Sequence, residues 1–284
     1  MNFRSIKDLT KAIYSNMPYL PRDIDIIVGV PRSGMLPASM LALYMNKPLV
    51  DFDGYLSNRT FDTGNTRKRL ITKINNIEHK KILIVDDSIN KGIQLKICKE
   101  RIKETIPNNQ DTILWCAVYG LDENKDKVDF CFEICEQMRI FEWNMMAKPI
   151  LASSCMDIDD VMALSNSRTK GNLKLQIPEL KPLYLPSRKV GHLVTCRLEK
   201  DREATVKWLQ KYNIKYDELH MMKYNTPEER RRGGMHAKYK ADIYKRTGCK
   251  LFIESSEKQA IEIHRLTRKP VICTDNMVLY KIGN

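Results

Sequence analysis

The hydrophobic positions of this chain form short apolar runs that alternate with longer stretches of helical period. In the first half, the apolar runs are bounded by turn residues and are Ile24–Val30, Lys81–Val85, Thr112–Tyr119 and Val128–Ile134. Helical stretches such as Met35–Tyr44 and Ile93–Ile106 lie between several of these runs. Because strands that alternate with helices usually form a mostly parallel sheet, the pattern predicts an α/β fold.

After Phe141 the pattern starts afresh and predicts a second α/β unit. The strands expected there are His192–Thr195, Lys250–Ile253 and Pro270–Thr274, and the helices are Arg202–Tyr212 and Ala237–Thr247. A typical domain size of roughly 150 residues also favours two domains in a chain of 284 residues. We therefore predict one domain over residues 1–148 and another over residues 149–284, with a junction near Met146–Leu151.

Composition fits a folded water-soluble protein, with 43% hydrophobic and 29% charged residues. No stretch approaches the roughly 18 uninterrupted apolar residues that a membrane helix needs. The charged amino end is unlike a secretory leader. We expect a cytoplasmic protein with no membrane partner, in which the eight cysteines are reduced thiols.

The net charge of +13 is divided unevenly along the chain. Residues 1–150 contain 22 basic and 19 acidic side chains, whereas residues 151–284 contain 26 basic and 16 acidic ones. Such a surplus favours a phosphorylated partner, from a nucleotide to a nucleic acid, because the summed field attracts anions. The charge alone does not choose among these partners.

Two strand–loop–helix segments in the first half have the pattern of phosphate-binding sites. One apolar strand is followed directly by Asp86 and Asp87 and then by a short loop and a helix. This order places ligands at the carboxyl edge of a parallel sheet, where free N–H groups of the helix face an anion. The alternative is that Asp87 or Ser88 caps the helix beside an ordinary turn. The segment Ile26–Gly34 repeats the pattern, and two such loops on neighbouring strands suggest a ligand with two phosphate groups.

The first half resembles the type I phosphoribosyltransferases in the segments Val85–Gly92, Gly29–Gly34 and Ser57–Leu70. The resemblance implies that Asp86 and Asp87 bind the ribose hydroxyls of phosphoribosyl pyrophosphate (PRPP). The implied loop around the 5-phosphate consists of Ser88, Ile89, Asn90, Lys91 and Gly92. The implied pyrophosphate loop consists of Pro31, Arg32, Ser33 and Gly34, and the implied hood loop carries Arg67, Lys68 and Arg69.

This resemblance implies a reaction in which a base nitrogen displaces pyrophosphate from the anomeric carbon of ribose. PRPP and a nucleobase would be the substrates and Mg²⁺ the cofactor, but the sequence does not identify the base. Lys91 stands where the family usually has threonine, so an ammonium replaces a hydroxyl donor. For Arg67, Lys68 and Arg69 a solvated basic turn remains the alternative.

A second group of candidate residues lies in the second half. Asp157 and Asp159 follow an apolar segment, and a tight turn there can bring both carboxylates to one metal ion or phosphate. The Asp-x-Asp pattern alone is a weak signal, because surface loops often contain it. Further polar residues at strand ends and on a helix are Thr195, Lys238, Lys240 and Glu254.

Across residues 157–273 the second half resembles the haloacid-dehalogenase-like (HAD) phosphatases, which have a Rossmannoid sheet. The resemblance implies that Asp157 is a nucleophile that forms an aspartyl-phosphate, that Asp159 is the general acid/base, and that Thr195 contacts a phosphoryl oxygen. Lys240 or Lys238 would clamp the charge, and only one can serve because positions two apart on a helix do not share a face. Lys240 is favoured. The implied metal ligands are Asp157, Asp159 and Glu254.

We therefore expect a bifunctional enzyme of nucleotide metabolism that transfers a phosphoribosyl group and hydrolyses a phosphate ester with Mg²⁺, with a nucleoside as the product if the sites act in sequence. One alternative is a nucleic-acid-end phosphatase with a nucleotide-binding domain. Another is a non-catalytic sensor of PRPP or a nucleotide, suggested by Lys91 and by Ser255 and Ser256 after Glu254, where a second carboxylate is common. A homodimer is left open.

Overall fold

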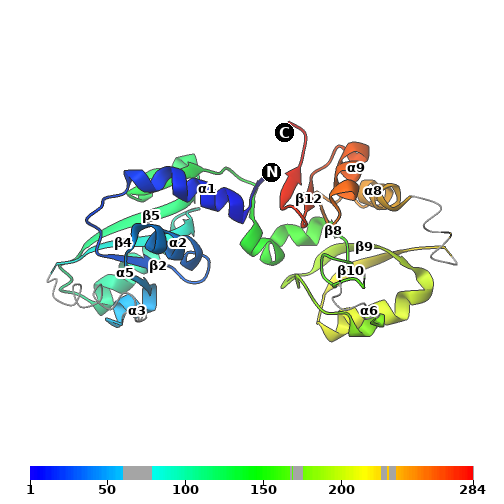
Figure 1. Cartoon of the computed structure of the whole chain (residues 1–284), viewed down its shortest axis with the longest axis horizontal. Coiled ribbons are helices and arrows are strands. Elements are labelled where there is room, and N and C mark those ends of the chain that lie inside the picture. The colour runs from blue at the N-terminus through cyan, green and yellow to red at the C-terminus, as the bar shows by residue number, and fades with distance from the viewer. Residues whose placement is uncertain (60–78, 167, 169–174, 225–228, 230–234, 284) are drawn as a thin grey trace. The chain divides into compact units, whose positions relative to one another are not determined.

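The chain divides into two compact units, Met1–Trp143 and Asn144–Asn284, in a computed structural model (Figure 1). The structure describes residues 1–59, 79–166, 168, 175–224, 229 and 235–283. The predicted hood residues Arg67, Lys68 and Arg69 lie outside the described residues. Within the described part of the chain, no helix is long and apolar enough to cross a membrane.

The first unit is built on a five-stranded parallel sheet with the strand order β3-β2-β4-β5-β6. Its strands are β2 (Ile26–Gly29), β3 (Leu49–Asp51), β4 (Lys81–Ser88), β5 (Thr112–Gly120) and β6 (Phe130–Ile134). A separate parallel pair joins β1 (Asn2–Arg4) to β7 (Arg139–Phe141). Helices cover both faces of the large sheet, which explains why β2 and β4 are continuous apolar runs rather than alternating ones.

The helices of the first unit lie in two layers (Figure 1). One core joins α1 (Ile6–Asn16) and α2 (Met35–Met45) to one face of the sheet. Another core joins α3 (Phe52–Leu56) and α5 (Ile93–Thr105) to the other face. The 3-10 helices are η1 (Met17–Tyr19), η2 (Asp122–Lys127) and η3 (Glu142–Ala147). The expected α/β fold with a parallel sheet is therefore confirmed for this unit.

The second unit contains a six-stranded sheet with the order β10-β9-β8-β11-β12-β13. Its strands are β8 (Ser154–Met156), β9 (Val190–Leu198), β10 (Tyr216–Met222), β11 (Leu251–Glu254), β12 (Val271–Cys273) and β13 (Val278–Tyr280). All neighbours are parallel except β12 and β13. Numbered along the unit, the parallel strands run 3-2-1-4-5, the doubly wound order in which ligands bind at the carboxyl ends of the strands.

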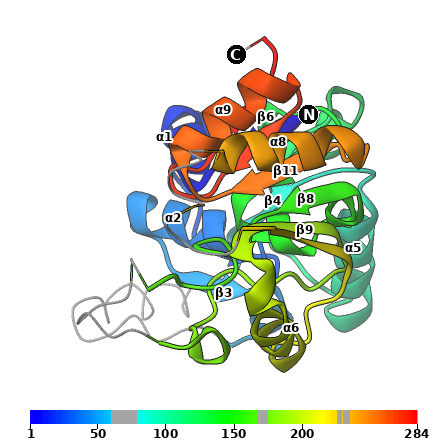
Figure 2. The ribbon, with the colours of Figure 1, turned by 90° about the vertical axis from the view of Figure 1, so that its right-hand side faces the viewer.

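Helices cover both faces of this second sheet as well (Figure 2). On one face lie α8 (His236–Arg246) and α9 (Glu257–Thr267), and on the other lies α6 (Arg202–Lys211). The 3-10 helices are η4 (Pro149–Ser153), η6 (Ile177–Glu179) and η7 (Glu199–Asp201). Trp208 of α6 is fully buried, and its indole N–H donates to the carbonyl of Leu180 at 2.7 Å, so this helix is anchored to the segment before β9.

Candidate functional site

Two loops meet at the carboxyl edge of the first sheet. Strands β2 and β4 are direct neighbours, with Gly29 opposite Val85. The Ser33 hydroxyl donates to Oδ1 of Asp87 at 3.0 Å, which joins the loop after β2 to the end of β4. A Cβ atom at Gly34 would lie 2.6 Å from the carbonyl oxygen of Val30 and 2.8 Å from that of Val85. Only glycine permits this close approach, so Gly34 allows the two loops to pack against each other.

The acidic pair Asp86 and Asp87 lies at this junction. Both belong to the last part of β4, and Asp87 is buried. Oδ2 of Asp87 accepts a hydrogen bond from the Trp143 indole at 2.7 Å, and Oδ1 of Asp86 accepts one from the Asp87 backbone at 2.8 Å. Burial, and then the charge of Asp87, raise the pKa of Asp86 to about 8. Among the described residues, no lysine or arginine forms an ion pair with either carboxylate.

Trp143 is a site residue that the sequence interpretation missed. It belongs to η3, directly after β7, and its ring stacks on Phe141 with the ring centroids 4.9 Å apart and the planes inclined by 3°. Phe141 in turn stacks on the buried Tyr119 of β5, with the centroids 5.3 Å apart. The aromatic column fixes the direction of the indole N–H toward Asp87. Nothing local in the sequence indicates this contact, because the two residues are 56 positions apart.

The loop after β4 is held by its backbone and leaves a helix start free. Ser88 still belongs to β4, and the backbone N–H of Ile89 donates to the carbonyl of Tyr119 at 2.8 Å. Gly92 has φ +80°, a conformation that favours glycine, and it directly precedes α5. The side chains of Asn90 and Lys91 are exposed. The first N–H groups of α5 therefore remain available for an anion.

A cavity of about 220 Å³ lies beside this loop. Its polar lining comes from Asp86, Ser88 and the loop backbone, and its apolar lining includes Trp115 and Cys98. Of the predicted pyrophosphate loop, Pro31 and Arg32 are exposed and Ser33 is half-buried. The structure thus brings Ser33 into direct contact with Asp87, whose backbone N–H bonds to Asp86, and leaves Arg32 and Lys91 exposed to solvent.

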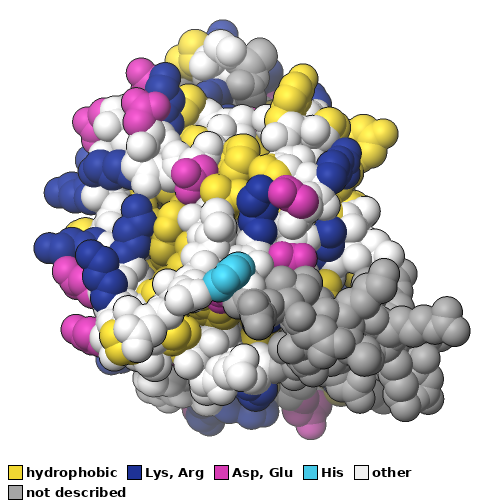
Figure 3. Space-filling model, turned by 90° about the vertical axis from the view of Figure 1, so that its left-hand side faces the viewer, with side chains coloured by type: hydrophobic (Ala, Val, Ile, Leu, Met, Phe, Trp, Pro, Cys, Tyr) yellow, Lys and Arg dark blue, Asp and Glu magenta, His cyan; other side chains and the backbone are white. Residues whose placement is uncertain are grey.

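Figure 3 shows one face of the molecule, on which lysine and arginine side chains gather at the two sides. Apolar side chains lie between these groups, and acidic side chains lie among the basic ones as well as between them. A shallow groove of about 550 Å³ beside α5 is lined mainly by lysines, namely Lys91, Lys96, Lys99, Lys103 and Lys127. On the face shown in Figure 3, the basic side chains therefore form separate groups and not one continuous patch.

In the second unit, Asp157, Lys240 and Glu254 form one buried cluster. Nζ of Lys240 lies 2.6 Å from Oδ2 of Asp157 and 2.7 Å from Oε2 of Glu254. The Lys240 side chain is 2% exposed, whereas Lys238 is exposed to solvent. Burial, which the Lys240 charge opposes, raises the pKa of Asp157 to about 7. The structure therefore brings Lys240, and not Lys238, to the carboxylates.

A second ion pair lies next to this cluster and involves a residue that the sequence interpretation missed. The buried Arg197 donates from Nη2 to Oδ1 of Asp159 at 2.7 Å, and its Nε lies 3.1 Å from both carboxylate oxygens. The Thr195 hydroxyl donates to Oδ2 of Asp159 at 3.3 Å. Asp159, Thr195 and Arg197 are thus one hydrogen-bonded group. Its sequence signal was a basic residue two positions after Thr195 on β9.

Glu254 is saturated with hydrogen bonds from the protein. Its Oε1 accepts from the backbone N–H groups of Ser255 and Ser256, each at 3.0 Å, and its Oε2 accepts from Lys240. The Ser255 hydroxyl donates to the backbone carbonyl of Asp159 at 3.1 Å. Glu254 therefore acts on the cluster through Lys240, and its role as a metal ligand stays a prediction.

The chain is similar in sequence to phosphoribosyltransferases. Residues 2–148, more than half of the 284 residues, match the family model described as a phosphoribosyl transferase domain. An amidophosphoribosyltransferase of Saccharomyces cerevisiae is 32% identical over 119 residues, which cover 36% of this chain and 23% of the yeast protein. The chain thus spans about a quarter of that relative's length.

Solved structures that match part of this chain include two phosphoribosyltransferases. A purine phosphoribosyltransferase from Pyrococcus horikoshii has a TM-score of 0.36 and 20% identity over 50% of this chain and 92% of its own. A xanthine-guanine-hypoxanthine phosphoribosyltransferase from Helicobacter pylori has a TM-score of 0.38 and 15% identity over 50% of this chain and 91% of its own.

Proposed function

Since the chain belongs to the phosphoribosyl transferase domain family through residues 2–148, we propose that its first unit transfers the phosphoribosyl group of PRPP to a nitrogen of a nucleobase. The observation that carries this proposal is the direct contact between the two loops. The Ser33–Asp87 hydrogen bond and the close packing at Gly34 put both loops at one edge of the sheet. A ligand with two phosphorylated ends needs this arrangement, with an acidic pair between the ends.

Different residues at this edge of the sheet would bind different parts of PRPP. Asp86 and Asp87 would accept hydrogen bonds from ribose hydroxyls, and the N-terminal N–H groups of α5 would bind the 5-phosphate. The Pro31–Gly34 loop would bind the pyrophosphate. In the reaction the base nitrogen forms a bond to the anomeric carbon while the bond from that carbon to the pyrophosphate oxygen breaks. The nitrogen then loses its proton, and preorganised donors stabilise the departing charge.

Magnesium fits the first site by the chemistry of its donors. Mg²⁺ prefers oxygen ligands, and it is usually held by one or two carboxylates together with substrate phosphates. Among the described residues, no lysine or arginine pairs with Asp86 or Asp87, so the acidic pair lacks a compensating positive charge. When bound, Mg²⁺ would supply that charge to the pyrophosphate leaving group.

The test of this proposal is turnover of PRPP with Mg²⁺ and a panel of purine, pyrimidine and pyridine bases, with pyrophosphate release as the measurement. We expect release with at least one base, and loss of at least about a hundredfold in the double variant D86N/D87N. The control is D126N, which changes an exposed acid of the same unit. Absence of pyrophosphate release with every base, or full activity in D86N/D87N, would contradict the proposal.

We propose that the second unit hydrolyses a phosphate monoester, with the nucleotide made by the first unit as the simplest substrate. Asp157 would attack phosphorus, and the bond from phosphorus to the ester oxygen would break. Asp159 would give a proton to the departing oxygen and then take one from the water that hydrolyses the aspartyl-phosphate. The contacts of Lys240 with Asp157 support a role in holding the nucleophile. Thr195 would contact a phosphoryl oxygen.

Magnesium fits this second site at Asp157 and Asp159, which offer carboxylate oxygens. Three carboxylates face two cations here, Lys240 and Arg197, so the cluster carries a net negative charge that a divalent ion would balance. When bound, Mg²⁺ would polarise the phosphoryl group. Glu254 fits less well as a direct ligand, because protein donors occupy both of its oxygens.

One observation favours a second candidate for this unit, a phosphate-binding sensor without turnover. Arg197 forms an ion pair with Asp159 through both of its carboxylate oxygens, and this pair must open before Asp159 can donate a proton. Hydrolysis of a generic phosphate ester that is lost in D157N but kept in K238M supports the phosphatase. Tight nucleotide binding with no hydrolysis by wild type supports the sensor. Turnover restricted to polynucleotide ends, with steep salt dependence, would instead favour a nucleic-acid-end phosphatase.

A further inference from the structure

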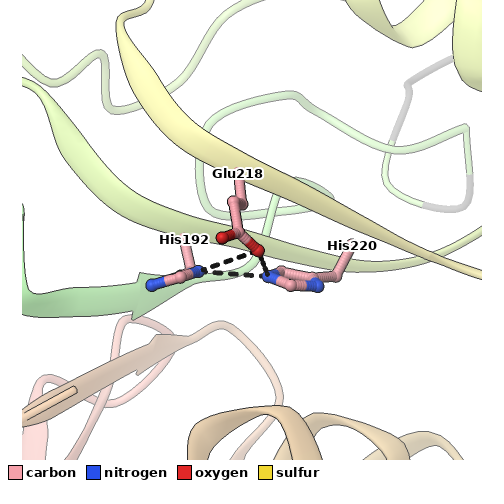
Figure 4. Close-up of side chains that lie close together, drawn as sticks. All are labelled: His192, Glu218 and His220. Carbon is pink, nitrogen blue, oxygen red and sulfur yellow. Dashed lines mark hydrogen bonds and ion pairs between the residues drawn. The ribbon is translucent and has the colours of Figure 1, made fainter. Parts of the chain in front are cut away.

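Three potential metal ligands converge on the second sheet, away from the carboxylate cluster. His192 lies on β9, and Glu218 and His220 lie on β10 (Figure 4). One ligand atom of each residue lies within 4.8 Å of the others, and this is the one such group of histidine, cysteine and acidic side chains among the residues that the structure describes. Nothing local in the sequence indicates this group, because the two histidines are 28 positions apart.

The parallel pairing of β9 and β10 builds this group. Glu218 is the register partner of His192, and His220 is the partner of Val194. Because side chains of a strand alternate between faces, Glu218 and His220 share a face, and so do His192 and Val194. Val194 belongs to the core that packs under α8. His192, Glu218 and His220 therefore lie on the α8 side of the sheet, near its edge. A rigid pair of neighbouring strands therefore holds all three side chains.

The distances between the ligand atoms match those of a single coordination sphere. Nδ1 of His192 lies 3.1 Å from Nε2 of His220, which lies 3.3 Å from Oε2 of Glu218. Nδ1 of His192 lies 3.8 Å from the same oxygen. Bonds of about 2.0–2.1 Å to a tetrahedral ion place its ligand atoms about 3.3 Å apart. The three atoms thus approximate one face of such a polyhedron, and only the 3.8 Å edge between His192 and Glu218 has to shorten.

The surroundings of the group suit a cation with an exchangeable ligand. The side chains of His192 and His220 are 18% and 20% exposed, so the imidazoles are positioned by packing. A cavity of about 420 Å³ adjoins them and is also lined by Ile243, Arg246 and Thr247. The cavity leaves room for water or a small anion beside Arg246.

We propose that His192, Glu218 and His220 bind one divalent first-row transition-metal ion of the zinc class. Two imidazoles and one carboxylate suit zinc and its neighbours rather than Mg²⁺ or Ca²⁺, which prefer oxygen ligands. The remaining position of the ion faces the cavity, as in three-ligand sites that keep one site open. His192 precedes Thr195 by three residues along β9, about 10 Å in a strand, so this ion is separate from any Mg²⁺ at Asp157.

The test uses the full chain, free of any histidine tag and stripped of metal with a chelator, and Zn²⁺ and Co²⁺ as the probes. We expect one equivalent of Zn²⁺ per chain in titration calorimetry. We expect the bound Co²⁺ to show visible absorption bands of nitrogen and oxygen coordination, without intense thiolate charge-transfer bands. Thiolate bands would assign binding to the cysteines and overturn the proposal, as would the absence of stoichiometric binding.

Three variants connect the binding to these residues. H192Q and H220Q should each weaken Zn²⁺ binding by at least tenfold, because even the loss of groups that only orient metal ligands costs about 10–100-fold in affinity. E218Q removes the charge of a side chain that is 63% exposed, so its loss of affinity cannot be assigned to misfolding. H79Q, which changes an exposed histidine of the first unit, is the control and should bind like wild type. Wild-type affinity in both H220Q and E218Q would overturn the proposal.

Discussion

The two units place acidic side chains at the carboxyl edges of parallel strands, but they compensate the negative charge in opposite ways. In the first unit, Asp87 is hydrogen bonded by the neutral groups of Ser33 and Trp143, and no described cation pairs with Asp86 or Asp87. In the second unit, the buried cations Lys240 and Arg197 contact the acids directly. The first site is thus prepared for a cationic ligand, whereas the second already contains most of its counter charge.

This difference has consequences for stability. A buried carboxylate that is solvated only by neutral donors destabilises the fold when it ionises. A buried ion pair destabilises the fold when one partner is removed, because the remaining charge stays in a low-dielectric environment. The pH and the choice of variant should therefore act differently on the two units.

The largest effect is expected for K240M in the second unit. This change removes the cation between Asp157 and Glu254 and should cost about 3–5 kcal/mol of unfolding free energy. The thermal midpoint should fall by about 2–4 °C for each kcal/mol, as followed by circular dichroism. The loss should be smaller at pH 5 than at pH 8, because protonated carboxyls need no partner. The control K238M, at an exposed position of the same helix, should change stability by less than about 0.5 kcal/mol; equal stability of both variants would contradict the comparison.

D86N should give the next largest effect, with the opposite sign. The pKa of Asp86 is about 8 in the folded chain against 3.8 in a model peptide, so the folded state favours the protonated carboxyl. Between these pH values, ionisation of Asp86 lowers wild-type stability as the pH rises, and the asparagine avoids this loss. D86N should therefore be more stable than wild type by about 2–4 kcal/mol at pH 9 and by little at pH 4, as measured by denaturant unfolding without ligands.

The exposed acid Asp126 provides the matched control, because D126N should show no such pH-dependent gain. PRPP together with Mg²⁺ should reduce the difference in stability between D86N and wild type, because the ligands should stabilise wild type and not D86N. A gain in D86N that is independent of pH would contradict the assigned cause.

The strands and turns that hold the first site could be predicted from the sequence, because each has a signal in a short continuous stretch of residues. Strands β2 and β4 are buried on both faces and therefore appear as apolar runs, and the glycines at 34 and 92 mark the turns that follow. The strand β10 was not predicted, because it is an edge strand in which Asp217 and Glu218 interrupt the apolar pattern. The helix Glu257–Thr267 was not predicted either, although Ser256 caps it.

Contacts between distant segments account for the rest of both sites. The acids Asp86, Asp157 and Asp159 could be chosen from their place after apolar strands. Trp143, the partner of Asp87, and Arg197, the partner of Asp159, could not be assigned in this way, because the contacts span 56 and 38 positions and depend on how the strands are ordered in the sheets. Local pattern therefore identifies which residues can react, and tertiary packing decides which charges they meet.

W143F tests the neutral compensation in the first unit. The phenyl ring can keep the stack on Phe141 but cannot donate to Asp87, so the variant should lose about 1.5–3 kcal/mol, the usual contribution of a hydrogen bond to a charged group. A double-mutant cycle with D87N isolates this bond, and W143F should cost much less in the D87N background. W115F, which removes the indole of another buried tryptophan of the unit, serves as the control and should show no coupling to D87N.

The smallest effect is expected for S33A, which removes the hydroxyl that connects the two loops. The hydroxyl donates to the same carboxylate as Trp143, but over 3.0 Å instead of 2.7 Å and from a half-buried side chain that water can replace, so the loss should lie at the low end for such a bond, about 1.5 kcal/mol, and the variant should remain folded. S39A, which changes a serine of α2 whose hydroxyl donates to the carbonyl of Met35 in the same helix, should alter stability less. If the loops must stay together to bind both ends of PRPP, S33A should also raise the KM for PRPP, and S33T should restore it because threonine retains the hydroxyl. A raised KM in S33T equal to that in S33A would mean that the packing at Gly34, rather than the Ser33–Asp87 hydrogen bond, holds the loops in place.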